Sequence, residues 1–217
     1  MEEIANGSRP RIAVLVSGRG SNLQAIIDAI AAGDLHATIA IVISNRADAH
    51  GVTRARDAGI ETAVLKPREY ATREAYDSAV ADLLRSRDVD LVCLAGFMRL
   101  VGAPLLAAFP NRILNIHPSL LPAFPGLDAQ RQAIEHGVRI SGATVHFVTA
   151  ELDGGPIILQ TAVPVFDDDT AETLATRILV EEHKLYPEAI GIALEEGSRI
   201  EGRRFVRPAA GRRSNSN

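Results

Sequence analysis

The chain has 217 residues, of which 47% are hydrophobic and 23% are charged, a composition typical of a soluble globular protein with a substantial core. Its formal net charge of −4 argues against binding to nucleic acids or anionic membranes, because both favour basic surfaces. No apolar stretch reaches the roughly 18 residues of a membrane-spanning helix, and the first residues lack the apolar segment of a signal peptide. We therefore expect a cytoplasmic protein that binds neither nucleic acid nor membrane.

The single cysteine, Cys93, excludes an internal disulfide and a cysteine-based metal cluster. It lies in the apolar run 91–95, which predicts a buried structural thiol. We expect residues 1–10 to form a flexible leader, residues 11–207 a single α/β domain and residues 208–217 a flexible tail.

The first structured segments predict a strand, a glycine-rich turn and a helix. Residues 11–17 are apolar and rich in β-branched side chains, as in a buried parallel strand. The turn at residues 18–22 is followed by apolar residues at helical spacing as far as Gly33. In this arrangement backbone N–H groups and a helix N-terminus can hold an anion. The turn lacks the full G-x-G-x-x-G pattern, which favours a phosphate monoester over a dinucleotide; a tight turn without a ligand is the alternative.

Strands and helices then alternate along the chain, with further strands predicted at residues 38–43, 60–65, 90–95 and 112–116. This order implies a doubly wound, mainly parallel, Rossmann-like α/β sheet. Ligands bind beyond the carboxyl ends of such strands. We therefore expect residues 17–22, 96–101 and 115–117 to converge.

After Gly126 the pattern changes to an antiparallel C-terminal extension. Residues 139–149 and 156–165 alternate polar and apolar side chains, which predicts an antiparallel pair of strands. A short helix is expected at 128–136, a helix broken or kinked at Pro187 follows the pair, and residues 199–206 form a last strand. Asp169 and Glu172 resemble a capping box for that later helix.

Asn115 and His117 are the first candidates for chemistry. They alternate at the end of a predicted strand and so project from one face, before a loop that contains three prolines. An amide and an imidazole placed together suit the stabilisation of a developing oxyanion. Asp153, followed by two glycines, is either a turn aspartate or a third member of this group. A carboxylate beside His117 would favour the imidazolium, which can donate a proton. His146 is open to both readings, as a packed or a catalytic histidine.

The sequence lacks the motifs of a zinc site and of a serine nucleophile. No histidine pair has metal-ligand spacing, so we expect no zinc site. The nucleophile elbow G-x-S-x-G is absent, so covalent catalysis is not favoured.

The motifs NIHPSLLP and ELDGGP, together with SGRGSNLQAII, REAYD and LAGFMRLV, resemble the folate-dependent formyltransferases, especially the branch that acts on glycinamide ribonucleotide. The resemblance covers residues 11–205. It implies a formyltransferase-type domain whose N-terminal half binds phosphate and whose C-terminal half binds folate. It also implies small-molecule substrates and formyl transfer in purine (IMP) biosynthesis, and it is compatible with a homodimer. The donor would be the co-substrate 10-formyltetrahydrofolate, the acceptor the amine of glycinamide ribonucleotide, and no metal would be needed.

The resemblance also implies roles for individual residues. The catalytic group would be Asn115, His117 and Asp153. The ribonucleotide would be bound by Gly20, Ser21, Asn22 and Glu182. The folate would be bound by Arg73, Met98, Arg99, Leu100, Val101, Asn115, Thr149, Ala150, Glu151, Leu152 and Asp153. One helical turn before Glu182, where the family often has a polar or basic residue, this chain has Leu179, so its ribose contacts differ from that pattern.

Three other functions are weighed against this one. Methionyl-tRNA formyltransferases carry an additional C-terminal RNA-binding domain, and formyltetrahydrofolate deformylases carry an N-terminal regulatory domain; neither is expected here. A non-catalytic folate- or nucleotide-binding sensor would have no need of Asn115, His117 and Asp153 together. Release of tetrahydrofolate in the presence of the amine distinguishes the transferase from the deformylase and from the sensor.

Overall fold

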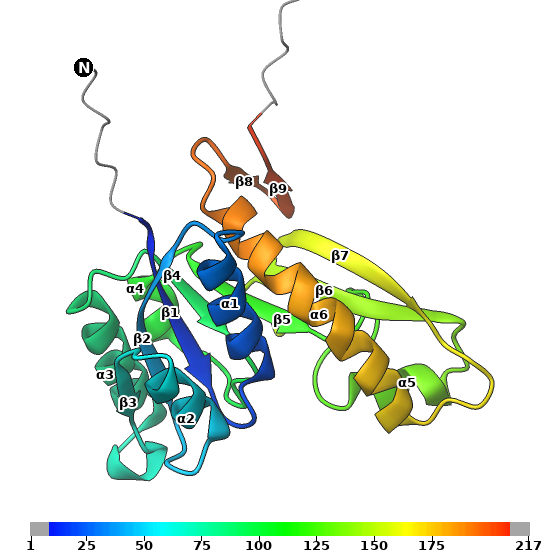
Figure 1. Cartoon of the computed structure of the whole chain (residues 1–217), viewed down its shortest axis with the longest axis horizontal. Coiled ribbons are helices and arrows are strands. Elements are labelled where there is room, and N and C mark those ends of the chain that lie inside the picture. Colours follow the sequence, from blue (N-terminus) through cyan, green and yellow to red (C-terminus); the bar gives the residue numbers. More distant parts are fainter. Residues whose placement is uncertain (1–8, 209–217) are drawn as a thin grey trace, which may run out of the picture.

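The apolar runs predicted as strands form the parallel half of a nine-stranded sheet, ordered β3-β2-β1-β4-β5-β6-β7-β9-β8 (Figure 1). The computed structural model describes residues 9–208, so the predicted leader and tail lie almost entirely outside the described residues. The parallel strands are β1 (Arg11–Val16), β2 (Thr38–Ser44), β3 (Thr62–Val64), β4 (Leu91–Leu94) and β5 (Ile113–His117). The predicted doubly wound, mainly parallel sheet is confirmed, and the strand order reverses between β1 and β4.

Helices cover both faces of this parallel half, because successive side chains of each strand point to opposite faces. In β1, Ile12, Val14 and Val16 face one core and Ala13 and Leu15 face the other. The helices of this half are α1 (Ser21–Ala32), α2 (His50–Asp57), α3 (Arg73–Arg85) and α4 (Ala103–Ala108), with a 3-10 turn, η1, at Pro67–Glu69. Apolar residues of α1 and α2 belong to the first core, and those of α3 and α4 to the second. Cys93 is buried in the first core, as predicted.

The second half of the sheet is antiparallel where it joins the first, as expected from the alternation of residues 139–165. Strand β6 pairs antiparallel with both β5 and β7. The elements of this half are α5 (Ala129–Glu135), β6 (Ile140–Phe147), β7 (Ile157–Pro164), α6 (Ala171–Ala193), β8 (Arg199–Glu201) and β9 (Arg204–Val206). The single last strand predicted at residues 199–206 is wrong, because a turn at Gly202 divides it into the β8–β9 hairpin.

The long helix α6 corrects two further expectations. Its capping box is formed by Thr170 and Thr173, one position after the predicted pair. Asp169 lies outside the helix and accepts hydrogen bonds from the Arg177 guanidinium and the Phe166 N–H. The helix is also not broken at Pro187, since it runs on to Ala193. Pro187 lies in a buried stretch of α6, where packing against the sheet offsets the backbone hydrogen bond that proline cannot donate.

Helix α6 packs beside α1 on the same face of the sheet and fixes the strands that carry the candidate site (Figure 1). The buried Tyr186 hydroxyl donates to the carbonyl of Leu94, at 3.0 Å, and lies 3.3 Å from that of Leu114. One side chain of α6 thus reaches the last residue of β4 and the second residue of β5.

Within residues 9–208, no helix combines the length and the apolar character needed to cross a membrane.

Replacing Thr170 with Ala is expected to lower the free energy of unfolding by about 1 kcal/mol. The substitution removes the side-chain acceptor of the Thr173 N–H, which Thr170 Oγ1 holds at 3.3 Å. Urea unfolding followed by circular dichroism measures the change. Thr176→Ala is the matched control, because Thr176 lies on the exposed face of the same helix and should change stability by less than about 0.5 kcal/mol. Equal effects of the two substitutions would contradict the assignment of the cap.

Candidate active site

The strand order reverses between β1 and β4, and at this point the first two segments predicted to converge, residues 17–22 and 96–101, come together. The Ser17 N–H donates to the carbonyl of Gly96 at 3.2 Å. The Ser17 hydroxyl donates to Asn45 Oδ1 at 2.6 Å and accepts from the Met98 N–H at 2.8 Å. The turn after β1 and the loop after β4 are therefore tied together. The third segment, residues 115–117, lies next to them in the sheet, because Leu94 at the end of β4 pairs with Asn115 of β5.

The glycine-rich turn presents the N-terminus of α1 to this region. Gly20 has a φ of 70°, in the left-handed region that favours glycine. A Cβ at this position would also lie 2.5 Å from the Cα of Gly51, so glycine allows α2 to approach the turn. Beyond Gly20, the first N–H groups of a twelve-residue helix point outward without carbonyl partners of their own. With the helix dipole, these groups are suited to hold an anion.

Asn22 and Glu182, predicted separately as substrate ligands, lie in direct contact. Asn22 Nδ2 donates to Glu182 Oε2 at 2.8 Å, and both side chains are buried. Burial raises the pKa of Glu182; the hydrogen bond from Asn22 and the charges of His117 and Arg19 oppose this shift. Asn22 Oδ1 is buried with no hydrogen-bond partner among the described residues, so it is available to accept a hydrogen bond from a ligand.

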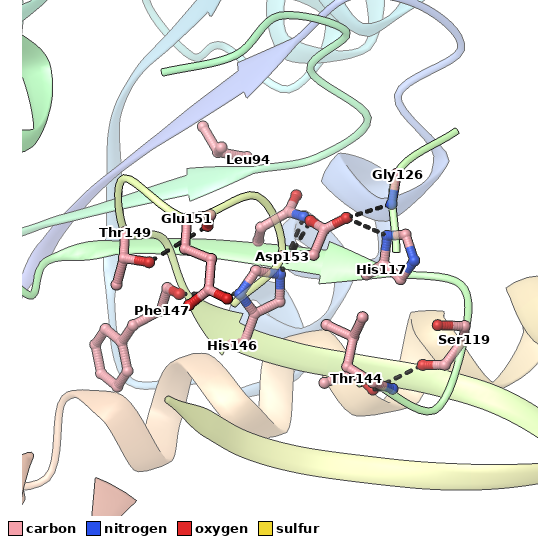
Figure 2. A network of polar contacts seen from close by, with 12 residues as sticks. Leu94, His117, Ser119, Gly126, Thr144, His146, Phe147, Thr149, Glu151 and Asp153 are labelled. Atoms are coloured by element: carbon pink, nitrogen blue, oxygen red, sulfur yellow. Dashed lines mark hydrogen bonds and ion pairs between the residues drawn. The ribbon is translucent and has the colours of Figure 1, made fainter. Parts of the chain in front are cut away.

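Strands β5 and β6 build a polar face opposite the apolar one. Leu114, Ile116 and Val145 point into the core beneath α6. The alternate residues Asn115 and His117 pair across the two strands with His146 and Thr144 respectively, so all four side chains share the other face. The predicted placement of Asn115 and His117 on one face is therefore confirmed. Figure 2 shows His117, His146 and Thr144 on this face, with the Asp153 carboxylate beside the two histidines.

Asp153 joins this face from the loop between β6 and β7. Its Oδ2 lies 3.4 Å from His117 Nδ1 and accepts the Gly126 N–H at 2.8 Å, and its Oδ1 lies 3.7 Å from His146 Nε2 (Figure 2). The backbone of Asp153 has a φ of 50°, a strained conformation for a residue other than glycine. Gly155, two residues after Asp153, has no room for a side chain, since a Cβ there would overlap the Phe147 carbonyl oxygen. Close approach of two chain segments thus holds the carboxylate beside the histidines.

The proline-containing loop, residues 118–126, closes over the end of β5. His117 Nε2 lies 2.8 Å from the carbonyl oxygen of Phe124, another residue with positive φ. Thr144 anchors the loop by donating to the Ser119 carbonyl, at 2.7 Å, and accepting the Leu121 N–H, at 3.1 Å. Gln160 adds a bond to the Leu121 carbonyl. Sequence reasoning missed Thr144 and Gln160, because their role depends on the pairing of β6 with its neighbours.

Most of the candidate folate residues lie in two loops, whereas Arg73 lies in α3 and Asn115 in β5. Residues 98–101 follow β4, and residues 149–153 follow β6. Met98, Leu100 and Leu152 expose more than half of their surface, which is the apolar character a planar ring would cover. The first loop is held by α3, because Arg73 donates to the Leu100 carbonyl at 2.9 Å and Asp77 accepts the Gly102 N–H at 2.8 Å.

Two predicted ligands have protein partners of their own. The Arg99 guanidinium lies over the ring of Tyr76, 4.7 Å from its centre, and Glu151 pairs with Arg203 at 3.2 Å. His183 is half-buried. It lines a hollow with Ser21 and Arg54. The described residues hold no cluster of three or more His, Cys, Asp or Glu side chains arranged for a metal ion.

Residues 10–190 match the family described as formyl transferase. The chain belongs to this family. It is 49% identical over 176 residues to the phosphoribosylglycinamide formyltransferase of Escherichia coli K12, a match that covers 81% of this chain and 83% of that protein. The structure is similar to that of glycinamide ribonucleotide transformylase 1 from Symbiobacterium toebii, with a TM-score of 0.92 and 58% identity over 95% of this chain and 98% of that one.

A second group of formyl transferase relatives is much longer. The chain is 46% identical over 193 residues to the trifunctional purine biosynthetic protein adenosine-3 of Drosophila melanogaster. That match covers 88% of this chain but only 14% of the relative. The chain is thus similar to one part of these larger proteins.

Replacing Glu182 with Gln is expected to stabilise the ligand-free protein at neutral pH, by on the order of 1 kcal/mol. Burial raises the pKa of Glu182 in the folded state, so the folded protein resists ionisation that the unfolded chain undergoes freely above about pH 4.3. The native carboxyl therefore costs stability as the pH rises from 4 to 7, whereas the amide of Gln does not titrate.

Urea unfolding at pH 4 and pH 7 measures this effect. Glu188→Gln, at an exposed position of the same helix, is the control and should change stability little at either pH. A gain for Glu182→Gln that is the same at both pH values would show that the burial of charge is not its cause.

Proposed function

We propose that this formyl transferase moves the formyl group of 10-formyltetrahydrofolate to the primary amine of glycinamide ribonucleotide, a step of purine biosynthesis. The observation that carries the proposal is the group formed by Asn115, His117 and Asp153 at the end of β5. This group lies at the edge of the sheet where the anion-binding turn before α1 also lies. The names of the similar proteins from Escherichia coli and Symbiobacterium toebii support the same substrate.

The amine of the ribonucleotide is the nucleophile, so the protein supplies no covalent intermediate. Its attack on the formyl carbon forms a tetrahedral centre whose oxygen gains negative charge. Asn115 supplies a neutral N–H donor to this oxygen, and His117 supplies a charged one. The C–N bond to the folate then breaks, the folate nitrogen gains a proton and the amine loses one, so atoms and charge balance.

The contacts of His117 indicate which of its nitrogens takes part. The Phe124 carbonyl can only accept, so it holds a proton on Nε2, at 2.8 Å. Nδ1 faces the Asp153 carboxylate at 3.4 Å, which is close enough to stabilise a proton there but too long for a strong hydrogen bond. The Nδ1 proton is therefore the one available to the reacting atoms. After it is transferred, the Asp153 charge favours the return of a proton to Nδ1.

The two substrates would enter from different sides of this group. The turn at Gly20, Ser21 and Asn22 takes the phosphate at the N-terminus of α1. Glu182 and the free Oδ1 of Asn22 accept hydrogen bonds from the ribose hydroxyls or the amine. Leu179 adds no polar group to this side, so the ribose contacts fall to Glu182 and Asn22.

On the other side, the folate ring would lie between the loops at residues 98–101 and 149–153. The exposed Met98, Leu100 and Leu152 supply its apolar walls. The remaining predicted folate residues of these loops, Arg99, Val101, Thr149, Ala150 and Glu151, would shape the cleft with them. Arg73 keeps guanidinium N–H groups beyond its bond to Leu100, and these suit the folate carboxylates.

A spectrophotometric assay tests the activity. The protein is mixed with 10-formyltetrahydrofolate and glycinamide ribonucleotide, and the release of tetrahydrofolate is followed. Turnover that requires the amine supports the proposal. Turnover without the amine would indicate a deformylase instead, and tight binding without turnover would indicate a sensor.

Two substitutions should separate chemistry from binding. Asp153→Asn, which tolerates the positive φ of this position, is expected to lower kcat by about 100-fold or more with little change in the KM of the ribonucleotide. Ser21→Asp should instead raise that KM by about tenfold, because it places a negative charge beside the phosphate. Ser21→Ala is the control for the hydroxyl alone. Equal effects of Asp153→Asn on both constants would remove Asp153 from the chemistry, and an unchanged KM for Ser21→Asp would move the phosphate elsewhere.

A further inference from the structure

His146 is a buried histidine that lies directly opposite Asn115 in the pairing of β5 with β6. Only 2% of its surface is exposed. Its Nδ1 lies 2.9 Å from the carbonyl oxygen of Phe147, and its Nε2 lies 3.3 Å from Asn115 Nδ2. Both ring nitrogens therefore have defined partners, and one of those partners is the amide assigned to the oxyanion.

These two contacts determine where the ring carries its proton. A carbonyl oxygen only accepts hydrogen bonds, so Nδ1 must be the protonated nitrogen. An amide nitrogen only donates, so Nε2 must carry a free lone pair. His146 is thus neutral, with its proton on Nδ1. Burial lowers the pKa of His146, which agrees with a neutral ring. The titratable groups that face it are Asp153, which opposes this shift, and His117, which adds to it.

The tautomer of His146 in turn determines how the Asn115 amide is oriented. If the amide were turned over, Oδ1 would face the Nε2 lone pair, and two acceptors would oppose each other in a buried site. With Nδ2 held toward His146, one N–H is bound and the second remains free, since no other hydrogen bond from Nδ2 occurs within residues 9–208.

We propose that His146 is a positioning residue, whose unprotonated Nε2 holds the Asn115 amide with its free N–H available to the formyl oxygen. This inference rests on the proposed function for the identity of the oxyanion. His146 itself touches no reacting atom, and it acts only through Asn115. Asparagine amides can rotate, and the lone pair of a rigid, buried ring removes that freedom before the substrate binds.

A double-mutant cycle tests this relation by measuring kcat and KM for His146→Leu, Asn115→Ala and the double variant. His146→Leu keeps a side chain of similar size but no acceptor. We expect it to lower kcat by about 10- to 100-fold, part of the 10²–10³-fold that one oxyanion donor contributes, and to leave both KM values within a few-fold. In the Asn115→Ala background the same change should cost less than about threefold.

His146→Gln is the conservative variant that separates hydrogen bonding from packing. The Gln Oε1 can lie near the place of Nε2 and accept from Asn115, so we expect it to recover most of the kcat lost in His146→Leu. A purely structural role predicts a different pattern: equal losses for His146→Leu in both backgrounds, and no recovery by Gln. That pattern would overturn the proposal. Thermal unfolding of each variant identifies any loss that comes from misfolding.

A second measurement does not depend on turnover. Proton–nitrogen NMR spectra of the protein labelled with ¹⁵N-histidine report which ring nitrogen carries the proton. We expect a neutral His146 protonated on Nδ1 at pH 7, with an Nε2 resonance that shifts in Asn115→Ala. A proton on Nε2, or an Nε2 resonance unaffected by that substitution, overturns the inference whether or not the protein turns over substrate. A wild-type protein with the expected spectrum but no turnover would instead overturn only the proposed function.

Discussion

The antiparallel pairing of β5 with β6 is the constraint on which the candidate site depends. Parallel strands deliver their carboxyl ends to one edge of a sheet, and β5 brings Asn115 and His117 there. The antiparallel neighbour β6 sets two further polar residues opposite them, as the pairs Asn115–His146 and His117–Thr144. A register shift of one residue would turn every one of these side chains into the core. The apolar residues on the other face, beneath α6, prevent that shift.

Burial strengthens the electrostatic interactions on this polar face. It also means that each buried polar group needs a hydrogen-bond partner. His117 and His146 expose less than 5% of their surface, so an unpaired nitrogen on either ring would destabilise the fold. Each ring bonds a backbone carbonyl on one side; on the other, His117 faces Asp153 and His146 faces Asn115. The partners come from loops whose backbone is strained at Phe124 and Asp153. Such strain is often found where a rigid scaffold holds functional groups in place.

Much of the parallel half follows from local patterns in the sequence. Its β-branched runs, its helical spacing and Gly33 predict elements that the structure contains at nearly the same residues. The cap of α6 lies one position after the predicted one, because Asp169 and Thr170 are both good capping residues and Asp169 instead accepts from Arg177, Thr173 and the Phe166 N–H. The prediction that α6 breaks at Pro187 treated the helix as isolated, whereas α6 packs along a sheet and runs on to Ala193.

The sequence by itself determined which residues are candidates for the proposed chemistry. The alternation of Asn115 and His117 and the glycines after Asp153 are properties of neighbouring residues. Only the tertiary structure decided which distant residues meet them. The contacts of His146 with Asn115, of Glu182 with Asn22 and of Thr144 with the proline-containing loop join segments separated by 25 to 160 positions. Strand register and helix packing create these contacts, and both are set by the burial of the whole apolar core rather than by any local pattern.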